Sequence, residues 1–579
     1  MSVENIITEN LDIWTSAIKA KSASGRGTSN KLELYGIKKL RELILELAVR
    51  GKLVPQNSGD ETASTLLKKI EIEKNRLIKT KSIKASKIQG SITEIPFEVP
   101  KNWEWCFLYD LGRIVGGGTP KSGEPSYWCD DGVKWLTPAD LYGLKDKYIG
   151  CGKRDISPLG LEKSSAQLLP KGSVLFSSRA PIGYVAIASK ELATNQGFKS
   201  VVPYNIDCSD YIYYFLKRSA AEIDGKASGT TFKEVSGAIV SKILVPLPPL
   251  NEQNRIVKRV DELMALCDQL ESQTEASIEA HQTLVRSLLE TLTNAKDADE
   301  LNESWQRISA HFDVLFTTED SIDQLKQTIL QLAVMGKLVK QDPNDEPASK
   351  LLERIEAEKE QLIKDKKIKN QKKLPDVNLT EKRFKIPNSW VWTRFGNVTN
   401  SRLGKMLDKS KNIGNPLPYL RNTNVQWGRF ELDDLKLMRF EDSELEEFKL
   451  SKGDLLICEG GEPGRCAIWD NEIDEMYFQK ALHRVRTYTD IAPEYLKICL
   501  TVDCSNGVMQ AYFTGATIKH LVGAKLNSYV IPIPPLKEQI RIIERVSTLF
   551  ELCDNLSSQI KILHLCQIRL SEAQYSALV

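Results

Sequence analysis

The chain has 579 residues, which at roughly 150 residues per domain corresponds to about four compact units. Hydrophobic residues make up 41% and charged residues 27%, a globular composition that excludes a mainly disordered chain. Lys plus Arg (79) nearly balances Asp plus Glu (77), and the formal charge of +2 neither supports nor excludes a nucleic-acid binder.

The chain start and the counts of metal-binding residue types exclude several classes. The opening MSVENIITEN is acidic where a signal peptide is basic, and no run reaches ~18 apolar residues, so we expect no membrane segment. The 11 cysteines form no C-x-x-C pair and the five histidines show no ligand spacing. This predicts a reducing, cytoplasmic compartment without disulfides or bound metal. No Gly-Lys pair is followed by the Ser or Thr of a phosphate-binding loop.

The first predicted element is a helix near residues 32–50, ended by Gly51. A basic stretch follows at 67–88, with seven lysines and Arg76 against two glutamates. Attraction to phosphate and a merely solvated helix are both open interpretations of this stretch. We assign residues 1–94 to an N-terminal helical segment, in which the role of 1–30 stays open.

Residues 95–249 have a different character and are predicted to form a first recognition domain. Short β-rich runs, such as Ser173–Phe176 and Tyr184–Ile187, alternate with glycine and proline. Polar side chains on the expected loops suit hydrogen bonds to base edges. The predicted DNA contacts here are Thr119, Lys121, Ser122, Thr137, Asp140, Ser177, Ser178, Arg179, Asn195, Gln196, Lys199, Thr231 and Lys233.

A long helix is predicted from about residue 251 to 290, opening a helical region at 250–340. Pro248 and Pro249 cannot continue a helix backward and so sharpen its start. Its apolar or small positions alternate in steps of four and three, the seam of a coiled coil: Ile256, Val260, Leu263, Cys267 and Leu270. The alternative is a single amphipathic helix packed on its own domain.

The second half repeats these elements. A helix near 321–335 ends at Gly336, a basic helix or linker spans 341–379, and a second recognition domain spans 380–535. Residues 536–579 form a last helix with a matching seam. The predicted DNA contacts of the second domain are Lys405, Arg421, Asn422, Asn424, Gln426, Glu459, Arg465, Gln479, Lys480, Thr517 and Lys519.

The two halves are a tandem repeat. Leu40–Val54 matches Leu325–Val339 at 10 of 15 positions, and Pro246–Leu270 matches Pro532–Leu556 at 15 of 25 positions. The offset between copies is steady at the ends of each unit and drifts in between. A common frame therefore carries two different inserts, which is typical of a protein that reads two different things through equivalent supports.

These motifs resemble one known family, the DNA-specificity (S) subunits of type I restriction–modification systems. The resemblance rests on PLPPLNEQ (246–253) and PIPPLKEQ (532–539), each opening a long helix, with GGGTP (116–120), KGSVL (171–175), PIGYVAI (181–187) and KGDLL (452–456). In the second insert SRLG (401–404) stands where Gly-Gly-Thr-Pro is expected.

The resemblance implies an α+β fold, in which two mixed α/β target recognition domains are joined by long helices in an antiparallel coiled coil with approximate twofold symmetry. It implies binding of double-stranded DNA with a bipartite target. It also implies assembly with two modification subunits, which use S-adenosylmethionine to methylate adenine at N6, and two restriction subunits, which use ATP and Mg. The chain itself would be non-catalytic and bind no cofactor. Contacts to the modification subunit or within the frame would come from Glu252, Gln253, Arg255, Arg259, Glu538, Gln539, Arg541 and Arg545.

Two other functions stay open on the residues alone. One is a coiled-coil scaffold that tethers two protein-binding domains without nucleic acid, which salt-dependent DNA binding would separate from the first interpretation. The other is a self-contained methyltransferase, which would need a cofactor loop that the sequence does not show.

Overall fold

The structure is a computed structural model that describes residues 9–20, 32–84, 90–179, 181–227, 233–368, 373–408 and 412–579. The chain divides into two compact units. Unit 1 comprises Met1–Ser277 and Leu563–Val579, and unit 2 comprises Ile278–Ile562. Both divisions fall inside the long helices α9 (Leu250–Asn294) and α18 (Leu536–Leu578), so each of these helices contributes to both units.

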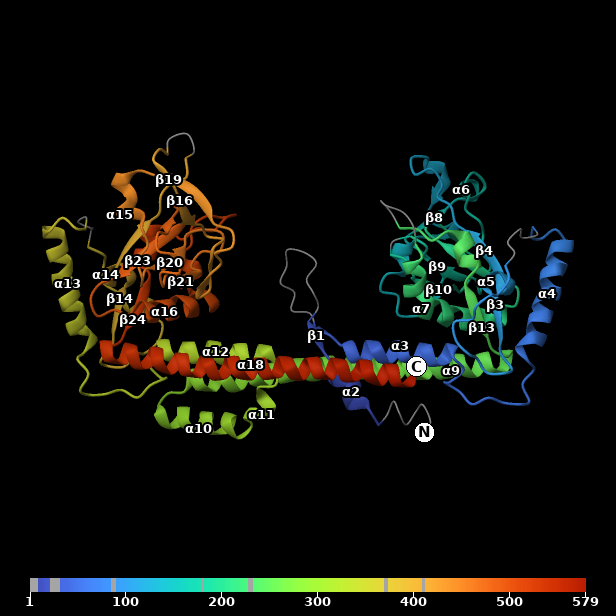
Figure 1. Ribbon diagram of the computed structural model, residues 1–579, viewed down its shortest axis with the longest axis horizontal. Coiled ribbons are helices and arrows are strands. Elements are labelled where there is room, and N and C mark those ends of the chain that lie inside the picture. Colours follow the sequence, from blue (N-terminus) through green and yellow to red (C-terminus); the bar gives the residue numbers. More distant parts are fainter. Residues whose placement is uncertain are drawn as a thin grey trace. The chain divides into compact units, whose positions relative to one another are not determined.

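Unit 1 is an α+β body whose elements are labelled in Figure 1. Its further helices are α2 (Leu11–Ser16), α3 (Tyr35–Val49), α4 (Ala63–Lys79), α5 (Leu108–Leu111), α6 (Pro158–Glu162), α7 (Ser209–Gly225) and α8 (Gly237–Ser241). Its strands are β1 (Lys19–Ala20), β2 (Leu32–Glu33), β3 (Glu104–Phe107), β4 (Gly112–Gly116), β5 (Trp128–Cys129), β6 (Val133–Leu136), β7 (Tyr148–Ile149), β8 (Arg154–Ile156), β9 (Val174–Phe176), β10 (Val185–Ala188), β11 (Ala193–Thr194), β12 (Lys199–Pro203) and β13 (Leu244–Leu247).

In the described residues of the unit 1 insert, the strands form three sheets. The largest has the order β4-β12-β9-β10-β7, a second has the order β11-β6-β8-β5, and β13 pairs with β3. The strands predicted from the runs at 173–176 and 184–187 are β9 and β10, which confirms both. They pair antiparallel, with Val185 opposite Phe176.

Unit 2 repeats this architecture. Its further helices are α10 (Ala298–Ala310), α11 (Phe312–Leu315), α12 (Glu319–Val334), α13 (Ala348–Lys364), α14 (Phe395–Val398), α15 (Leu445–Phe448), α16 (Pro493–Ser505) and α17 (Gly523–Ser528). Its strands are β14 (Val391–Arg394), β15 (Thr399–Leu403), β16 (Asn415–Leu420), β17 (Val425–Gln426), β18 (Arg429–Phe430), β19 (Lys436–Phe440), β20 (Leu455–Cys458), β21 (Cys466–Ile468), β22 (Tyr477–Phe478), β23 (Leu482–Thr487) and β24 (Val530–Ile533).

The central strands of the two units correspond, while the sheet edges differ. The sheet β15-β23-β20-β21 repeats β4-β12-β9-β10, and the pair β14-β24 repeats β3-β13. The parallel pair of β16 and β22 repeats that of β6 and β11. The repeat predicted from sequence identity at the ends of each unit therefore extends through the inserts, where the sequences have diverged.

The start of each long helix explains its Pro-Pro-Leu-x-Glu-Gln motif. The side chain of Gln253 donates to the Pro248 carbonyl at 2.9 Å, and that of Gln539 donates to the Pro534 carbonyl at 3.1 Å. Each glutamine side chain therefore links the first turn of its helix to the proline-containing segment that precedes the helix. The helices predicted near 32–50 and 321–335 are α3 and α12, and each is followed by the predicted glycine in a left-handed turn, Gly51 and Gly336.

Within unit 1, α9 and α18 run antiparallel. Arg41 of α3 bonds to Asp268 of α9 at 2.5 Å, and Gln56, beyond the end of α3, bonds to Glu252 at 2.6 Å, so α3 runs against α9. Tyr35 bonds to Glu572 at 2.7 Å, and Lys52 reaches the end of α18 at the Val579 carbonyl. The last turns of α18 therefore run with α3 and against α9.

Unit 2 builds the same arrangement from the other ends of the two helices. Lys326 of α12 pairs with Asp554 at 2.5 Å and Glu319 pairs with Lys561 at 3.1 Å, so α12 runs against α18. Lys337 donates to the carbonyl of Thr293 at 2.6 Å, which places the end of α9 beside the end of α12.

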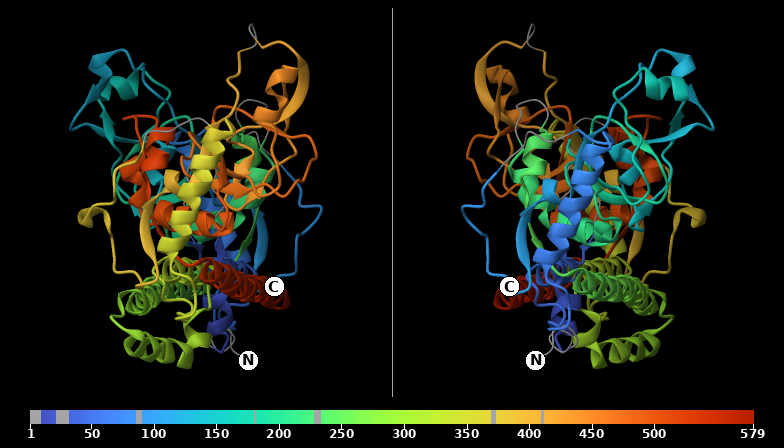
Figure 2. Two further views of the ribbon diagram at one scale, coloured as in Figure 1. Left: turned by 90° about the vertical axis from the view of Figure 1, so that its left-hand side faces the viewer. Right: turned by 90° about the vertical axis from the view of Figure 1, so that its right-hand side faces the viewer.

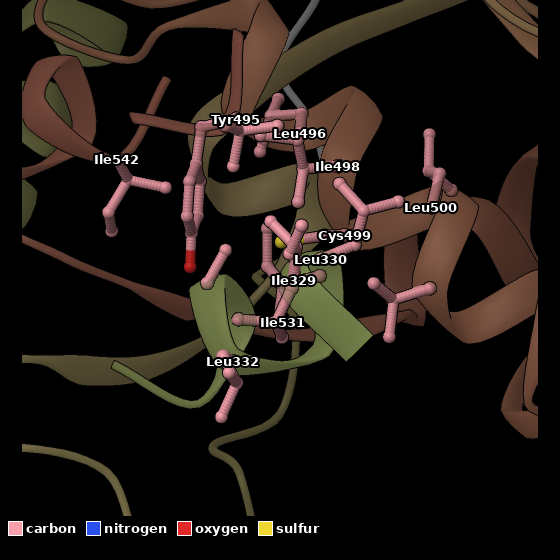
Figure 3. Packing of buried hydrophobic residues seen from close by; sticks show 14 of the residues in the cluster. Ile329, Leu330, Leu332, Tyr495, Leu496, Ile498, Cys499, Leu500, Ile531 and Ile542 are labelled. Atoms are coloured by element: carbon pink, nitrogen blue, oxygen red, sulfur yellow. The ribbon is translucent and has the colours of Figure 1, made fainter. Parts of the chain in front are cut away.

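The coiled-coil seam is shared with the inserts. In unit 1, the seam residues from Ile256 to Cys267 are buried in one core with α3 and α7. In unit 2, Ile329 and Leu332 of α12 pack with Tyr495 of α16 and Ile542 of α18 (Figure 3). Each insert is thereby fixed to its own helical layer by buried apolar contact.

The basic helices flank the inserts. In each unit, α4 or α13 runs along one side of its insert away from the helical layer (Figure 2). Leu66 and Ile70 of α4 and Leu351 and Ile355 of α13 are buried, while most of their charged side chains face solvent.

Candidate nucleic-acid interface

The helix-start motifs hold the frame together. Glu252 accepts hydrogen bonds from the amide of Gln56 at 2.6 Å and from the indole of Trp103 at 3.0 Å. In unit 2, Glu538 accepts from Gln341 at 2.6 Å. Burial raises the pKa of both carboxyls above the ordinary value.

These contacts correct part of the predicted partner surface. Glu252, Gln253, Glu538 and Gln539 are at most 1% exposed, so they present no surface to another chain. The resemblance allowed contacts either to the modification subunit or within the frame, and these four side chains make contacts within the frame.

The arginines of the same helix starts are more accessible. Arg255 pairs with Asp60 at 2.7 Å and Arg541 pairs with Asp345 at 2.6 Å, again at equivalent places. Arg259 pairs with Glu262 on its own helix, and Arg545 is exposed on α18. These four side chains stay candidates for a partner surface.

In unit 1 the loop after β4 crosses the β11–β12 loop. The amide of Gly118 donates to the Thr194 carbonyl at 2.8 Å, and the Thr119 hydroxyl donates to the Gln196 side chain. A Cβ on Gly117 would lie 2.3 Å from the Thr194 carbonyl oxygen, so only glycine fits this crossing. The crossing brings the exposed side chains of Thr119 and Gln196 together.

Unit 2 makes the same crossing without the expected motif. The amide of Lys405 donates to the Phe478 carbonyl at 3.1 Å. A Cβ on Gly404 would lie 2.4 Å from the carbonyl oxygens of both Phe478 and Gln479. Although SRLG (401–404) replaces the expected Gly-Gly-Thr-Pro, it keeps glycine at position 404, where the crossing requires it.

At each crossing, the second loop meets two further segments in what we call the loop junction. The junction comprises residues 177–179, 195–197 and 233–235 in unit 1, and 458–460, 479–481 and 519–521 in unit 2. In unit 1, the Ser178 amide donates to the Gly197 carbonyl at 2.7 Å, and the Val235 amide donates to the Ser178 carbonyl at 2.9 Å.

The junction of unit 2 has the same backbone hydrogen bonds. The Glu459 amide donates to the Ala481 carbonyl at 2.9 Å, and the Leu521 amide donates to the Glu459 carbonyl at 2.7 Å. Ser178 is therefore equivalent to Glu459. The isolated bridges Arg179–Glu234 and Gly460–His520 make those two pairs of positions equivalent as well.

The side chains at these equivalent positions differ completely. In unit 1, Arg179 pairs with Glu234 at 2.9 Å, and Lys199 approaches the other carboxylate oxygen at 3.2 Å. In unit 2, Glu459 pairs with the Nδ1 of His520 at 3.0 Å. Glu234 and His520 are absent from the predicted contacts. The signal that could have found them is the offset of 286 residues between PLPPLNEQ and PIPPLKEQ (532 − 246), which also separates residues 234 and 520.

Several predicted DNA contacts have internal roles instead. Four side chains are less than 10% exposed and cannot reach a duplex: Ser177, Ser178, Lys405 and Asn424. Ser177 donates to the Pro181 carbonyl at 2.8 Å, Ser178 donates to the Gly197 carbonyl at 3.2 Å, and Lys405 pairs with Glu444. Asn424 donates to the Glu431 carbonyl at 2.9 Å. Burial together with these bonds removes all four from the interface.

Four more side chains are committed to turns. Asp140 accepts from the Thr137 amide and hydroxyl, and Asn195 accepts from the Gly197 amide at 2.9 Å. Arg421 donates to the carboxylate of Asp434 at 2.8 Å. These bonds shape the loops on which the other candidates stand.

The remaining candidates are more accessible. In unit 2, Asn422 donates to the Gly460 carbonyl at 3.1 Å, which fixes it beside the junction, and Arg465 pairs with Glu462 at 2.8 Å. The exposed candidates are Lys121, Ser122, Lys233, Lys480, Thr517 and Lys519, and the half-exposed ones are Gln426 and Gln479. Thr231 lies outside the described residues.

Other kinds of site are not found in the part of the chain that the structure describes. There, no group of His, Cys, Asp and Glu could hold a metal ion, and no helix is long and apolar enough to cross a membrane. All 11 cysteines are described and each is a free thiol.

The chain matches known proteins along nearly its whole length. The family model for the type I restriction modification DNA specificity domain matches residues 100–280 and 387–563, one copy on each insert and its helix. The specificity subunit of the Escherichia coli type I restriction enzyme EcoEI is 36% identical, with 99% of both chains covered. The EcoAI specificity subunit, also from E. coli, is 36% identical, with 100% of both covered.

A solved structure is also similar: the crystal structure of the HsdS subunit from Thermoanaerobacter tengcongensis is 17% identical, covers 84% of this chain and 98% of that chain, and gives a TM-score of 0.42. The duplicated family match and the two full-length relatives agree with the tandem frame and its divergent inserts. The chain belongs to the family of type I restriction enzyme specificity subunits.

Proposed function

We propose that this chain reads a bipartite DNA sequence, with the insert of each unit recognising one half-site. The observation that carries the proposal is the pair of loop junctions, which have the same backbone hydrogen bonds and different polar side chains. A constant backbone with exchanged hydrogen-bonding groups is what two readers of different sequences require, because sequence is read by donors and acceptors that face base edges.

The chain would act within a larger complex. We propose that it assembles with two modification subunits and two restriction subunits, and that S-adenosylmethionine, ATP and Mg are bound on those partners. The names of the relatives, subunits of restriction enzymes, support such an assembly. Arg255, Arg259, Arg541 and Arg545 on the helix starts are the partner contacts that we propose. DNA as the target and eleven reduced cysteines favour the cytoplasm.

Comparing adenine methylation in cells that carry the whole system with and without this chain tests the proposal. Methylation at a two-part motif with a fixed spacer should be present only with the chain. Binding of the assembled complex to its motif should weaken steeply as salt rises, because phosphate contacts release counterions. Chain-independent methylation, or salt-insensitive binding, would favour the scaffold alternative.

A further inference from the structure

The acid of each loop junction comes from opposite segments in the two units. In unit 1 the carboxylate is Glu234, on the segment before α8, and the cation Arg179 follows β9. In unit 2 the carboxylate is Glu459, directly after β20, and its partner His520 comes from the other segment. The carboxylate and its partner have thus exchanged segments on an equivalent backbone.

This exchange leaves different groups available at the surface. The Arg179 side chain is 44% exposed, and Glu234 occupies its Nε and one Nη, so further guanidinium N–H donors remain. Both carboxylate oxygens of Glu234 are occupied, because the second oxygen pairs with Lys199. The junction of unit 1 therefore offers an oriented donor.

The junction of unit 2 offers an acceptor. His520 binds one carboxylate oxygen of Glu459, and the other accepts no hydrogen bond from the residues that the structure describes. Gly460 keeps this geometry, because a Cβ there would lie 3.1 Å from the Nδ1 of His520 and crowd the imidazole. An arginine like Arg179 at this position would displace His520.

We propose that the two junctions read base edges of opposite polarity: Arg179 donates to guanine in one half-site, and Glu459 accepts from an exocyclic amino group in the other. This inference rests on the proposed function. Arginine suits guanine because its planar donors match O6 and N7, and a carboxylate suits an amino group because it can only accept. Glu234 and His520 are positioning residues, since each orients the reading side chain of its unit.

Base analogues test this pairing of residue and atom. The full chain, assembled with its modification subunits, is given duplexes of its own target in which one base at a time is replaced. For unit 1, 7-deazaguanine removes the N7 acceptor from guanine. For unit 2, purine removes the amino group from each adenine other than the methylated one, whose N6 is the methyl acceptor, and pyrimidin-2-one removes it from cytosine, so the two analogues distinguish the two possible sources.

One analogue in each half-site should lower the methylation rate roughly 10-fold with the wild-type chain. The unit 1 analogue should have no further effect on Arg179→Ala, nor the unit 2 analogue on Glu459→Ala, because alanine has no side-chain donor or acceptor to sense the missing atom. Undiminished sensitivity of both variants to every analogue would overturn the proposal.

The unaltered half-site of each variant serves as the folding control, since the other insert must still read it. Asp470→Asn is the matched control in unit 2: it removes an exposed carboxylate, 2.7 Å from Lys452, at the other end of the β20–β21 pair, and should keep all analogue effects. Should Glu459→Ala fail to assemble, His520→Gln should show a weakened response to the same unit 2 analogue, and an unchanged response would also overturn the proposal. A wild-type complex that ignores every base replacement would instead contradict the proposed function itself.

Discussion

At the scale of single residues, the buried glutamate of each helix start gives a pH-dependent prediction. Burial raises the pKa of Glu252 in the folded protein above its unfolded value of about 4.3. The folded state then binds more protons in that window, and the stability that protonation contributes is lost as pH rises through it. Glu252→Gln keeps an acceptor for Gln56 and Trp103 without the charge.

We expect Glu252→Gln to be at least as stable as the wild type at pH 7, with a margin that shrinks as pH falls toward 4. Thermal unfolding across this range measures the margin. Glu252→Ala is the comparison: it leaves a buried indole N–H and an amide unpaired and should lose about 2 kcal/mol. If Glu252→Gln lost more stability than the wild type as pH rises, Glu252 would not have a raised pKa in the folded protein.

The glycine of the loop crossing gives a second prediction. In Gly404→Ala the new methyl group would meet two backbone carbonyl oxygens that no rotamer change can move. We expect a loss of about 1–3 kcal/mol and weaker discrimination in the half-site of unit 2. Gly523→Ala is the control, because its Cβ would meet only a His483 ring carbon at 3.7 Å. Equal effects of the two substitutions on half-site discrimination would show that the crossing does not matter.

Single residues also show where prediction from sequence stops. Gln253 and Glu252 are placed correctly at a helix start, because a proline pair and an amphipathic repeat are local signals. Their burial was not predictable, since it depends on Gln56 and Trp103, far away in the chain. Ser178 and Asn424 were predicted to be exposed loop donors, but both are buried. Composition identifies a polar loop but does not show whether its side chains point toward solvent or toward the protein.

At the scale of elements, each long helix serves both units, and this can be tested within α18. Ile560 is buried in the core of unit 2, whereas Tyr575, about four turns later, packs on the core of unit 1 and meets Lys39. A charge at Ile560 is costly, on the order of 3 kcal/mol, because it has no buried partner, and Tyr575→Asp removes the apolar ring that packs on the core of unit 1.

Ile560→Asp should therefore raise hydrogen exchange in α12, and Tyr575→Asp should raise it in α3. Each variant is the control for the other, because the substitutions lie on one helix. Exchange that rises equally in α3 and α12 for both variants would mean that the two units do not have separate cores.

The elements that carry apolar periodicity were predicted well, and those without it were not. The helices α3, α9, α12 and α18 all follow from sequence. The helices α10 and α11 lie in the region 250–340 that was predicted to be helical, but they were not predicted individually, and Leu315 and the following Phe316 are buried in the core of unit 2. The loop junctions gave no signal, because their register joins segments more than 50 residues apart (235 − 178).

At the scale of the whole molecule, the near-zero net charge of +2 fits a reader whose recognition loops contain both signs. The two units have equivalent frames and separate insert cores, so specificity should be modular. The boundaries of the first insert are suitable for an exchange, since β3 and β13 pair with each other and bring the two ends of the insert together.

Replacing residues 95–245 by the corresponding insert of another family member, and mapping methylated adenines in cells that carry the complete system, tests this modularity most directly. One half of the methylated motif should change to that of the donor, while the other half and the spacer between them stay the same. A motif in which both halves change, or neither does, would contradict the account.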